Sequence, residues 1–277
     1  MAAITSTDLT ESEERSAGQK AAAFFSEVFN RTIAFIVFFG LWEIAPRLNW
    51  IDPVFFPPFS KVMVTFWDLL ISGALPMNLL VSLQRAATGF ALGAVFAIPL
   101  GLLIGWFRGF EKLMKPLLET LRQTSAIALY PVLVVIFGLG ETSKIALVFW
   151  GTIWAMLLNS ISGVKNADPV LIKAARAMGA SQLVIFTKVI LPGAMPYLLT
   201  GIRLSATASI LILVAAEMMG ASKGLGYMLY DAQMKYKIPQ MYVAIVTMGI
   251  LGVSVNTLLT LLERKLLGWK EEINPNA

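Results

Sequence analysis

Long apolar runs constrain the fold of this chain more than any other feature of its sequence. A helix needs about 20 mainly apolar residues to cross a hydrocarbon core about 30 Å thick. Six runs meet this need when the chain is read in windows of about 19 residues: Thr32–Ala45, Ala86–Trp106, Leu117–Gly138, Lys144–Gly163, Gly193–Glu217 and Met241–Leu262. The composition agrees, because 57% of the 277 residues are hydrophobic and only 14% are charged. We therefore expect an all-α polytopic membrane protein with about six transmembrane helices.

The lysines and arginines predict how these helices are oriented, because cytoplasmic loops carry an excess of both residues. Of the 22, fourteen lie on one side of the six spans, seven lie on the other, and Arg203 lies within the fifth span. We assign the richer side to the cytoplasm, together with both termini and the segment Val164–Pro192. The expected organisation is a cytoplasmic tail at residues 1–30, a transmembrane domain at 31–266 with a long cytoplasmic loop at 164–192, and a cytoplasmic tail at 267–277.

Several classes of function are excluded by residues that the chain lacks. It contains neither cysteine nor histidine, so thiol nucleophiles, imidazole bases and the commonest transition-metal ligands are absent. A phosphate-binding loop would place glycine directly before its lysine, and the nearest string, Gly138–Lys144, does not. No basic run is long enough to follow the phosphates of a nucleic acid. We expect no catalytic residue, no metal site, no cofactor bound by this chain and no nucleic-acid partner.

Small residues recur at intervals of four along the second span. They are Gly89, Gly93, Ala97, Gly101 and Gly105. An interval of four aligns them on one helical face, where a second helix can approach closely and gain van der Waals contact within lipid. This pattern favours helix packing, and the alternative is a contact with a solute or another subunit.

Two spans carry polar residues that could line a translocation path. The third has Arg122, Thr124 and Ser125 in its early turns and then Tyr130 before a proline. A helix that breaks there would expose backbone groups, which membranes tolerate only against protein or a water-filled cavity. The alternative is an interfacial cytoplasmic helix with a proline kink.

The fifth span carries Ser205, Ser209 and, at its outer end, Glu217. The two hydroxyls could line a wet passage or bond within the protein, and packing is the favoured role. A carboxylate in hydrocarbon needs protein or water around it. For Glu217, path lining and a structural ion pair therefore both remain open.

The segment from Asp168 to Pro192 predicts two short helices in the cytoplasmic loop. Asp168 and Pro169 are typical of a helix start, and an amphipathic helix should run to Met178, where Gly179 ends or bends it. A second helix should run from Ser181 to Ile190 and stop before the fifth span. Such a pair suggests a docking surface for a soluble partner.

Within that segment, the spacing resembles a known family motif. Lys173, Ala174 and Ala175 are followed after three residues by Gly179, and after nine more by Val189–Pro192. This run resembles the EAA loop of binding-protein-dependent ABC importer permeases. The string FGLGETSK at Phe137–Lys144, and the run Ala215–Met218 followed along the chain by Gly224–Gly226, resemble the corresponding motifs of one branch of this family. That branch imports aliphatic sulfonates, taurine, nitrate or bicarbonate.

The resemblance implies a type I importer permease with a MetI-like fold, in a bacterial inner membrane. Two copies of the permease would form the path as a homodimer. Two cytoplasmic ATPases, which bind ATP and Mg²⁺, would dock on the EAA loops, and a periplasmic or lipid-anchored binding protein would deliver a small anion. The residues that it assigns to ATPase coupling are Lys173, Ala174, Ala175, Arg176, Met178, Gly179, Ala180 and Ser181.

Two positions depart from the family pattern. Lys173 replaces the glutamate that usually opens the motif, and Arg122–Ala126 replaces a proline-rich start of the third span. The competing class is an ion-coupled or passive transporter without an ATPase. Transport that persists without any ATPase would favour that class.

Overall fold

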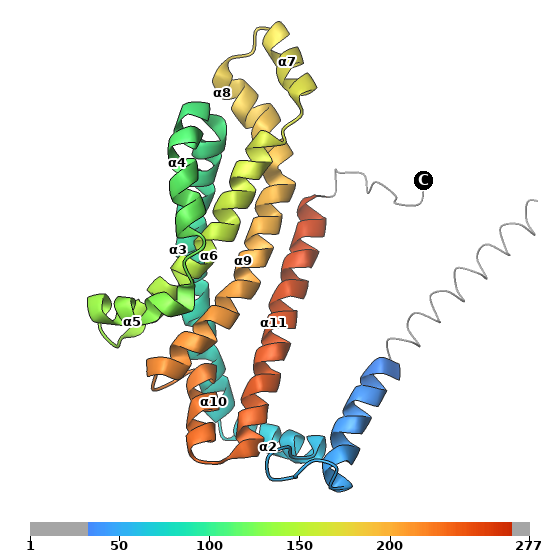
Figure 1. Ribbon diagram of the computed structural model, residues 1–277. Coiled ribbons are helices and arrows are strands. Elements are labelled where there is room, and N and C mark those ends of the chain that lie inside the picture. The colour runs from blue at the N-terminus through green and yellow to red at the C-terminus, as the bar shows by residue number, and fades with distance from the viewer. Residues whose placement is uncertain (1–32, 268–277) are drawn as a thin grey trace, which may run out of the picture. The chain divides into compact units, whose positions relative to one another are not determined.

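The computed structural model describes residues 33–267 and is helical throughout its regular elements, with no strand among those residues (Figure 1). Residues 33–47 form the first described helix. The others are α2 Phe59–Ile71, α3 Ala74–Trp106, α4 Arg108–Leu121, α5 Ala126–Phe137, α6 Glu141–Lys165, α7 Pro169–Ala177, α8 Gln182–Ile185, the π-helical turn η1 Phe186–Ile190, α9 Leu191–Gly220, α10 Leu225–Met234 and α11 Ile238–Leu266. The all-α prediction is confirmed. The predicted tail at 1–30, and all but the first residue of the predicted tail at 267–277, lie outside the described residues.

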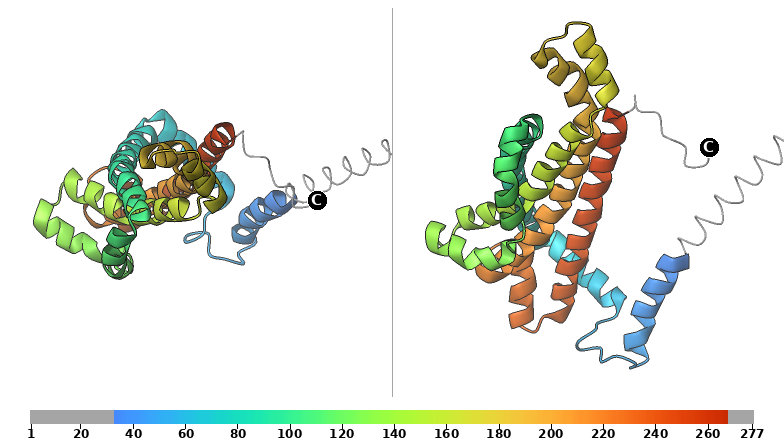
Figure 2. Two further views of the ribbon diagram at one scale, coloured as in Figure 1. Left: turned by 90° about the horizontal axis from the view of Figure 1, so that it is seen from above. Right: turned by 45° about the horizontal axis from the view of Figure 1, so that its top comes forward.

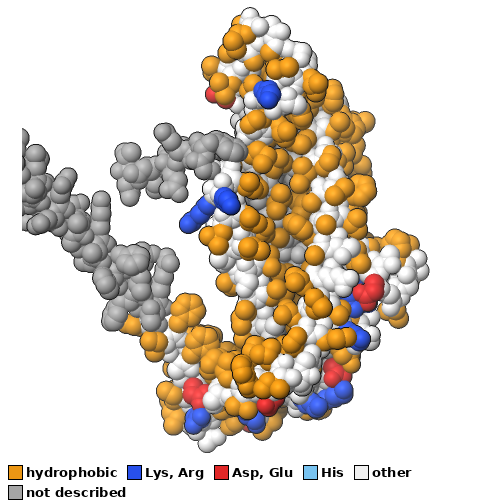
Figure 3. All heavy atoms as spheres, turned by 180° about the vertical axis from the view of Figure 1, so that it is seen from behind, with side chains coloured by type: hydrophobic (Ala, Val, Ile, Leu, Met, Phe, Trp, Pro, Cys, Tyr) orange, Lys and Arg blue, Asp and Glu red, His pale blue; other side chains and the backbone are white. Residues whose placement is uncertain are grey.

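Four described helices are long and apolar enough to cross a membrane. They are Ala74–Trp106, Glu141–Lys165, Gln182–Gly220 and Ile238–Leu266, where the third joins α8, η1 and α9. The pair α4 and α5 passes the same test as a fifth span. The first predicted span, Thr32–Ala45, begins outside the described residues and stays a prediction. Figure 3 shows hydrophobic side chains over much of one face of the helices, as contact with lipid requires.

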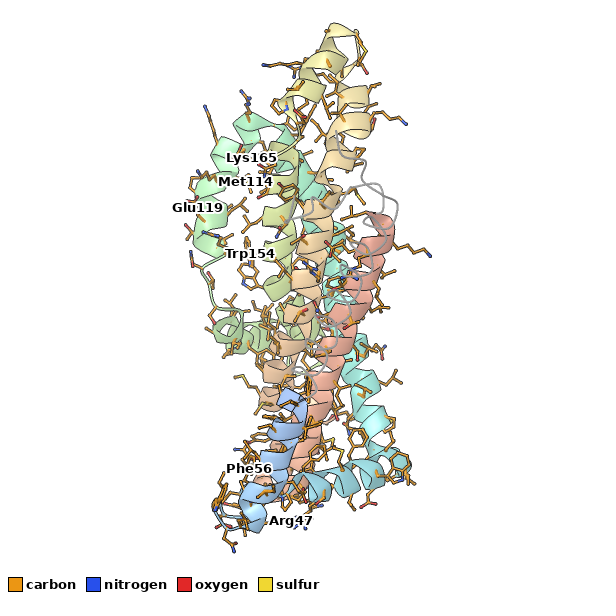
Figure 4. The ribbon with its side chains drawn as sticks, turned by 90° about the vertical axis from the view of Figure 1, so that its right-hand side faces the viewer. Arg47, Phe56, Met114, Glu119, Trp154 and Lys165 are labelled. Carbon is orange, nitrogen blue, oxygen red and sulfur yellow. The ribbon has the colours of Figure 1, made fainter. Side chains whose placement is uncertain are left out.

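The chain divides into two compact units, Met1–Thr65 and Phe66–Ala277. In the described part of the first unit, the ring centroid of Trp42 lies 5.7 Å from that of Phe56, which Figure 4 labels. Ser60 donates its backbone N–H and its hydroxyl to the Glu43 carboxylate at 2.8 and 2.9 Å. These contacts tie residues 33–47 to the start of α2.

In the second unit, α3 packs against α6 along the stripe of small residues. A Cβ atom added to the stripe would lie 2.6 Å from Val148 at Gly89, 2.7 Å from Thr152 at Gly93, 2.5 Å from Ser160 at Gly101 and 2.8 Å from Val164 at Gly105. The facing residues of α6 therefore also recur at intervals of four. Ala97 fills the remaining interval and is buried against Met156. The backbones are thus too close to admit side chains at the four glycines.

On its other side, α6 packs against α9 in the same manner. An added Cβ atom at Gly163 would lie 2.9 Å from Ala194, and one at Gly201 would lie 2.9 Å from Asn159. The hydroxyl of Ser205 donates to the carbonyl oxygen of Thr152 at 2.8 Å. Helix α6 is thus the central member of an α3–α6–α9 layer.

The third predicted span, Leu117–Gly138, is not one helix: it breaks at residues 122–125, within the polar stretch where the sequence allowed a broken helix. Helix α4 runs back beside α3 and α6, with Met114 of α4 and Trp154 of α6 on facing sides (Figure 4). After Leu121 the chain turns, and α5 leaves at 92° to α4 (Figure 2). Helix α5 starts at Ala126, where Ser125 is the N-cap and accepts the N–H of Ala128 at 3.4 Å. Pro131 lies inside α5 without breaking it.

Replacement of Gly101 by alanine is expected to destabilise the α3–α6 contact. The new methyl group would meet Ser160 Cβ at 2.5 Å and the Leu157 carbonyl oxygen at 2.7 Å, and overpacking costs roughly 1–3 kcal/mol. The free energy of unfolding, followed by thermal denaturation in detergent, should fall.

Gly249→Ala is the matched control, because Gly249 also lies inside a long helix but an added Cβ meets nothing within 4 Å. The gain in helix propensity, about 1 kcal/mol, is common to both variants. If Gly101→Ala is as stable as Gly249→Ala, the close approach of α3 and α6 is wrong.

Candidate functional site

The loop between α6 and α9 folds into two short helices at one end of the bundle (Figures 1 and 2). Asp168 caps α7 by accepting the N–H of Val170 at 2.7 Å, with Pro169 in the first turn. Gly179 follows α7 with a φ of 78°, a conformation that favours glycine. Ser181 then caps α8 by accepting the N–H of Val184 at 3.4 Å. Helix α7 therefore starts at Asp168 and Pro169 and is followed by a turn at Gly179, as the sequence predicted.

The loop has a small apolar core of its own. Ala175, Ile185 and Ile190 are buried in it together with Val164 at the end of α6. Phe186 packs edge-on against Trp106 of α3, with ring centroids 5.2 Å apart. The loop is therefore an ordered part of the bundle and not a solvated tether.

The eight predicted coupling residues divide between this core and the surface. Ala175 faces the core and Ala180 is half-buried, whereas the remaining six, Lys173, Ala174, Arg176, Met178, Gly179 and Ser181, are exposed. Met178 stands out because 81% of its surface is accessible although it is apolar. Ala175 thus packs the loop internally, while Ala174 and Met178 are available to a partner.

The second short helix continues directly into the fifth span, and the prediction that it stops before Pro192 is wrong. In the π turn η1, the N–H of Leu191 donates to the carbonyl oxygen of Phe186, five residues earlier. Pro192, which has no N–H to donate, follows at once in the first turn of α9. The wider π turn thus accommodates the proline, and a helix runs from Gln182 to Gly220.

The predicted path residues fall into two groups. Arg122, Thr124 and Ser125 are all exposed in the break between α4 and α5. Tyr130, Ser205, Ser209 and Glu217 are buried inside the chain. The hydroxyl of Ser209 donates to its own helix, to the carbonyl oxygen of Ala206 at 2.7 Å. The structure does not bring the two groups together within one chain.

Glu217 lies in a buried ionic cluster that joins α3, α6, α9 and the start of α10. Its carboxylate accepts a bond from Arg85 Nη1 at 2.7 Å, from the Ser82 hydroxyl at 2.8 and 2.9 Å and from the Gly226 N–H at 2.9 Å. The Glu217 side chain is 0% exposed. Of the two alternatives for Glu217, this geometry supports the structural ion pair.

Arg85 makes the cluster's remaining contacts. Its guanidinium donates to both carboxylate oxygens of Glu141, the first residue of α6, and Nη1 also donates to the Lys223 carbonyl oxygen at 2.6 Å. Sequence reasoning missed Glu141 and Ser82 as partners. The signal was present, because Arg85 and Glu217 are isolated opposite charges within apolar spans, where ionised groups usually pair.

Residues 33–267 contain no metal site, because no three or more His, Cys, Asp or Glu side chains lie together among them. The geometry instead combines a bundle of spans with an ordered terminal loop. Comparison with known proteins decides what this combination is. A family model, described as the binding-protein-dependent transport system inner membrane component, matches residues 97–268, more than half of the chain. The chain belongs to this family.

The curated relatives of this chain are named as transport permeases. A probable ABC transporter permease protein of Brucella abortus is 35% identical over 86% of this chain and 94% of the relative. The putative aliphatic sulfonates transport permease of Bacillus subtilis is 35% identical over 84% and 85%. The taurine transport system permease of Escherichia coli is 31% identical over 86% and 88%.

A solved structure of a methionine ABC transporter in an inward-facing conformation matches the permease with a TM-score of 0.60. The match covers 66% of this chain and 92% of the other, at 22% identity. It shows the fold alone. The expected type I importer fold is confirmed, and the permease is a multi-pass membrane protein.

Glu217→Gln should destabilise the permease strongly. The substitution removes the buried counter-charge of Arg85, which then keeps only the largely exposed Glu141. The cost should therefore approach the roughly 3–5 kcal/mol of a broken buried ion pair. Glu119→Gln is the matched control, because Glu119 pairs with Lys115 only at 4.0 Å on an exposed surface, where such pairs contribute about 0–1 kcal/mol. Equal thermal stability of the two variants in detergent would contradict the buried pair.

Proposed function

We propose that this permease forms the translocation path for a small anion in an ATP-driven importer, and that the loop at residues 164–192 couples it to a separate ATPase. Family membership supports the role in binding-protein-dependent transport. The observation that carries the coupling role is the unbroken helix Gln182–Gly220, which starts in the exposed loop and continues through the membrane domain. A partner that moves the loop would therefore move a transmembrane helix directly.

The exposed surface of the loop suits a protein partner. Met178, Leu183 and Val170 are apolar and mostly exposed at this end of the bundle, and they lie close to Lys173 and Arg176. Apolar side chains surrounded by charges are typical of a docking surface. ATP and Mg²⁺ would be bound by the partner ATPase, and cytoplasmic docking would place both termini of the six-span chain in the cytoplasm.

A second copy of the permease would complete the path. Helix α5 projects from the bundle with Val135 86% exposed and Ile136 64% exposed, and the polar break at residues 122–125 lies at its start. Within a membrane, non-helical backbone is tolerated against protein or a water-filled cavity. A homodimer that places two such breaks around one axis would satisfy this constraint and would form a passage with the exposed Thr124 and Ser125.

The substrate is a small anion, with sulfonates or taurine-like compounds preferred and nitrate or bicarbonate possible. The names of the relatives support this choice, because the Bacillus subtilis permease is described for aliphatic sulfonates and the Escherichia coli permease for taurine. A periplasmic or lipid-anchored binding protein would deliver the anion to the permease in a bacterial inner membrane. The competing function is ion-coupled or passive transport without an ATPase.

Reconstitution should separate these two functions. In proteoliposomes that contain the permease, its co-encoded ATPase and its binding protein, uptake of radiolabelled taurine or ethanesulfonate should require ATP, and the permease alone should hydrolyse none. Uptake that proceeds at the same rate without the ATPase would support the competing function. A binding protein that takes only cations or neutral sugars would contradict the choice of anion.

Ala174→Arg should weaken docking of the ATPase, because it places a long charged side chain on the exposed face of α7. We expect recovery of the ATPase in a pull-down to fall by about tenfold, equivalent to 1.4 kcal/mol, and ATP-driven uptake to fall with it. Gly109→Arg is the control, since Gly109 is exposed at the start of α4, outside the loop, with open space around it.

Lys173→Glu tests the departure from the family motif in the same assay. If the partner carries the usual basic residue, capture should improve; if it carries a complementary acidic residue, capture should weaken. Normal capture by Ala174→Arg would remove the loop from the docking surface.

A further inference from the structure

A cavity opens beside the ionic cluster, in the part of the bundle away from α7 and α8. Its volume is about 430 Å³, and its lining includes Gln84, Arg85, Thr88, Glu141, Ser222 and Lys223. These side chains supply guanidinium, ammonium, amide and hydroxyl donors. Arg85 itself is 5% exposed, so its charge is fixed at the inner wall of the cavity.

The charges around this cavity do not balance. The buried Arg85 and Lys144 and the exposed Lys223 are positive, whereas Glu141 and Glu217 are the carboxylates of the cluster. The count leaves one excess positive charge when the exposed Lys223 is included. Lys144 is buried at 2% exposure, and its ammonium group has one partner within the described residues, the Gly140 carbonyl oxygen at 2.9 Å. Buried cations are costly unless an anion compensates them. The surroundings therefore favour one further negative charge.

The two carboxylates on Arg85 are held in different ways. Glu217 is fixed by Ser82, by the Gly226 N–H and by Arg85, with its side chain fully buried. Glu141 is bound by Arg85 alone among residues 33–267, and its side chain is 60% exposed. Glu141 can therefore swing away without breaking any other bond, whereas Glu217 cannot.

We propose that Glu141 is an internal occupant of an anion-binding site, and that the head group of a sulfonate or similar oxyanion displaces it from Arg85. The planar guanidinium presents paired donors that suit a carboxylate or an oxyanion equally. Once Glu141 has moved, Gln84, Ser222 and Lys223 provide donors to the remaining oxygens, whereas the Thr88 hydroxyl already donates to the Gln84 carbonyl oxygen at 2.7 Å. The identity of the anion rests on the proposed function; the site itself rests on the cluster geometry.

The test is equilibrium binding of sodium ethanesulfonate to the purified permease in nanodiscs, without ATPase or binding protein. Glu141→Gln removes the competing carboxylate and should lower the Kd by about tenfold or more, because a charge-assisted bond to Arg85 becomes available to the probe. Glu119→Gln, at a distant exposed position, should leave the Kd unchanged. Ser222→Ala, which removes one hydroxyl from the lining of the cavity, should raise the Kd about threefold.

Methanesulfonamide, an uncharged probe of similar shape to methanesulfonate, should not gain affinity in Glu141→Gln, whereas methanesulfonate should. Sulfate, nitrate and bicarbonate are measured in parallel. If one of these gains affinity and ethanesulfonate does not, the site stands and the proposed substrate is wrong. If no anion gains affinity in Glu141→Gln, or the sulfonamide gains as much, the anion site is wrong. ATP-driven uptake by the complete wild-type importer separately tests the proposed function.

Discussion

The close contact of α6 with α3 and α9 is the constraint on which the rest of this structure depends. Lipid tails are as apolar as leucine, so the hydrophobic effect cannot hold membrane helices together. The glycines of α3 and the small residues of α9 allow backbones to approach until van der Waals contact stabilises the layer. The charged cluster of Arg85 and Glu217 lies within this layer and is buried because these helices meet. The loop at residues 164–192 is likewise anchored by the ends of α6 and α3.

Local features of the fold could be predicted from the sequence because their causes are local. The apolar runs give the spans, the interval of four in α3 gives a packing face, and Asp168, Pro169 and Gly179 give the start and end of α7. Each depends on residues within a few positions of one another. The exposed break after Leu121 was only partly foreseeable: its polar residues indicate a weak point, but they do not fix a right-angled turn.

The ionic cluster could not be assigned in the same way. Arg85 and Glu141 are separated by 56 residues, and Arg85 and Glu217 by 132. Their pairing depends on the register between α3, α6 and α9, which no single span determines. The π turn at Phe186–Ile190 was missed for a different reason, because Pro192 is ordinarily a sign that a helix ends. A widened turn before the proline accommodates it and lets two predicted helices become one.

That continuous helix has a mechanical consequence. Its 39 residues correspond to a length of about 58 Å at 1.5 Å per residue, nearly twice the roughly 30 Å of the hydrocarbon core. A substantial length must therefore project beyond the apolar layer. The buried ion pair restrains its far end, and the contacts of Ala194, Gly201 and Ser205 hold its middle against α6. A force that tilts this helix from α8 would therefore have to carry α6 with it, so motion at the loop would reach the membrane domain through a pair of packed helices.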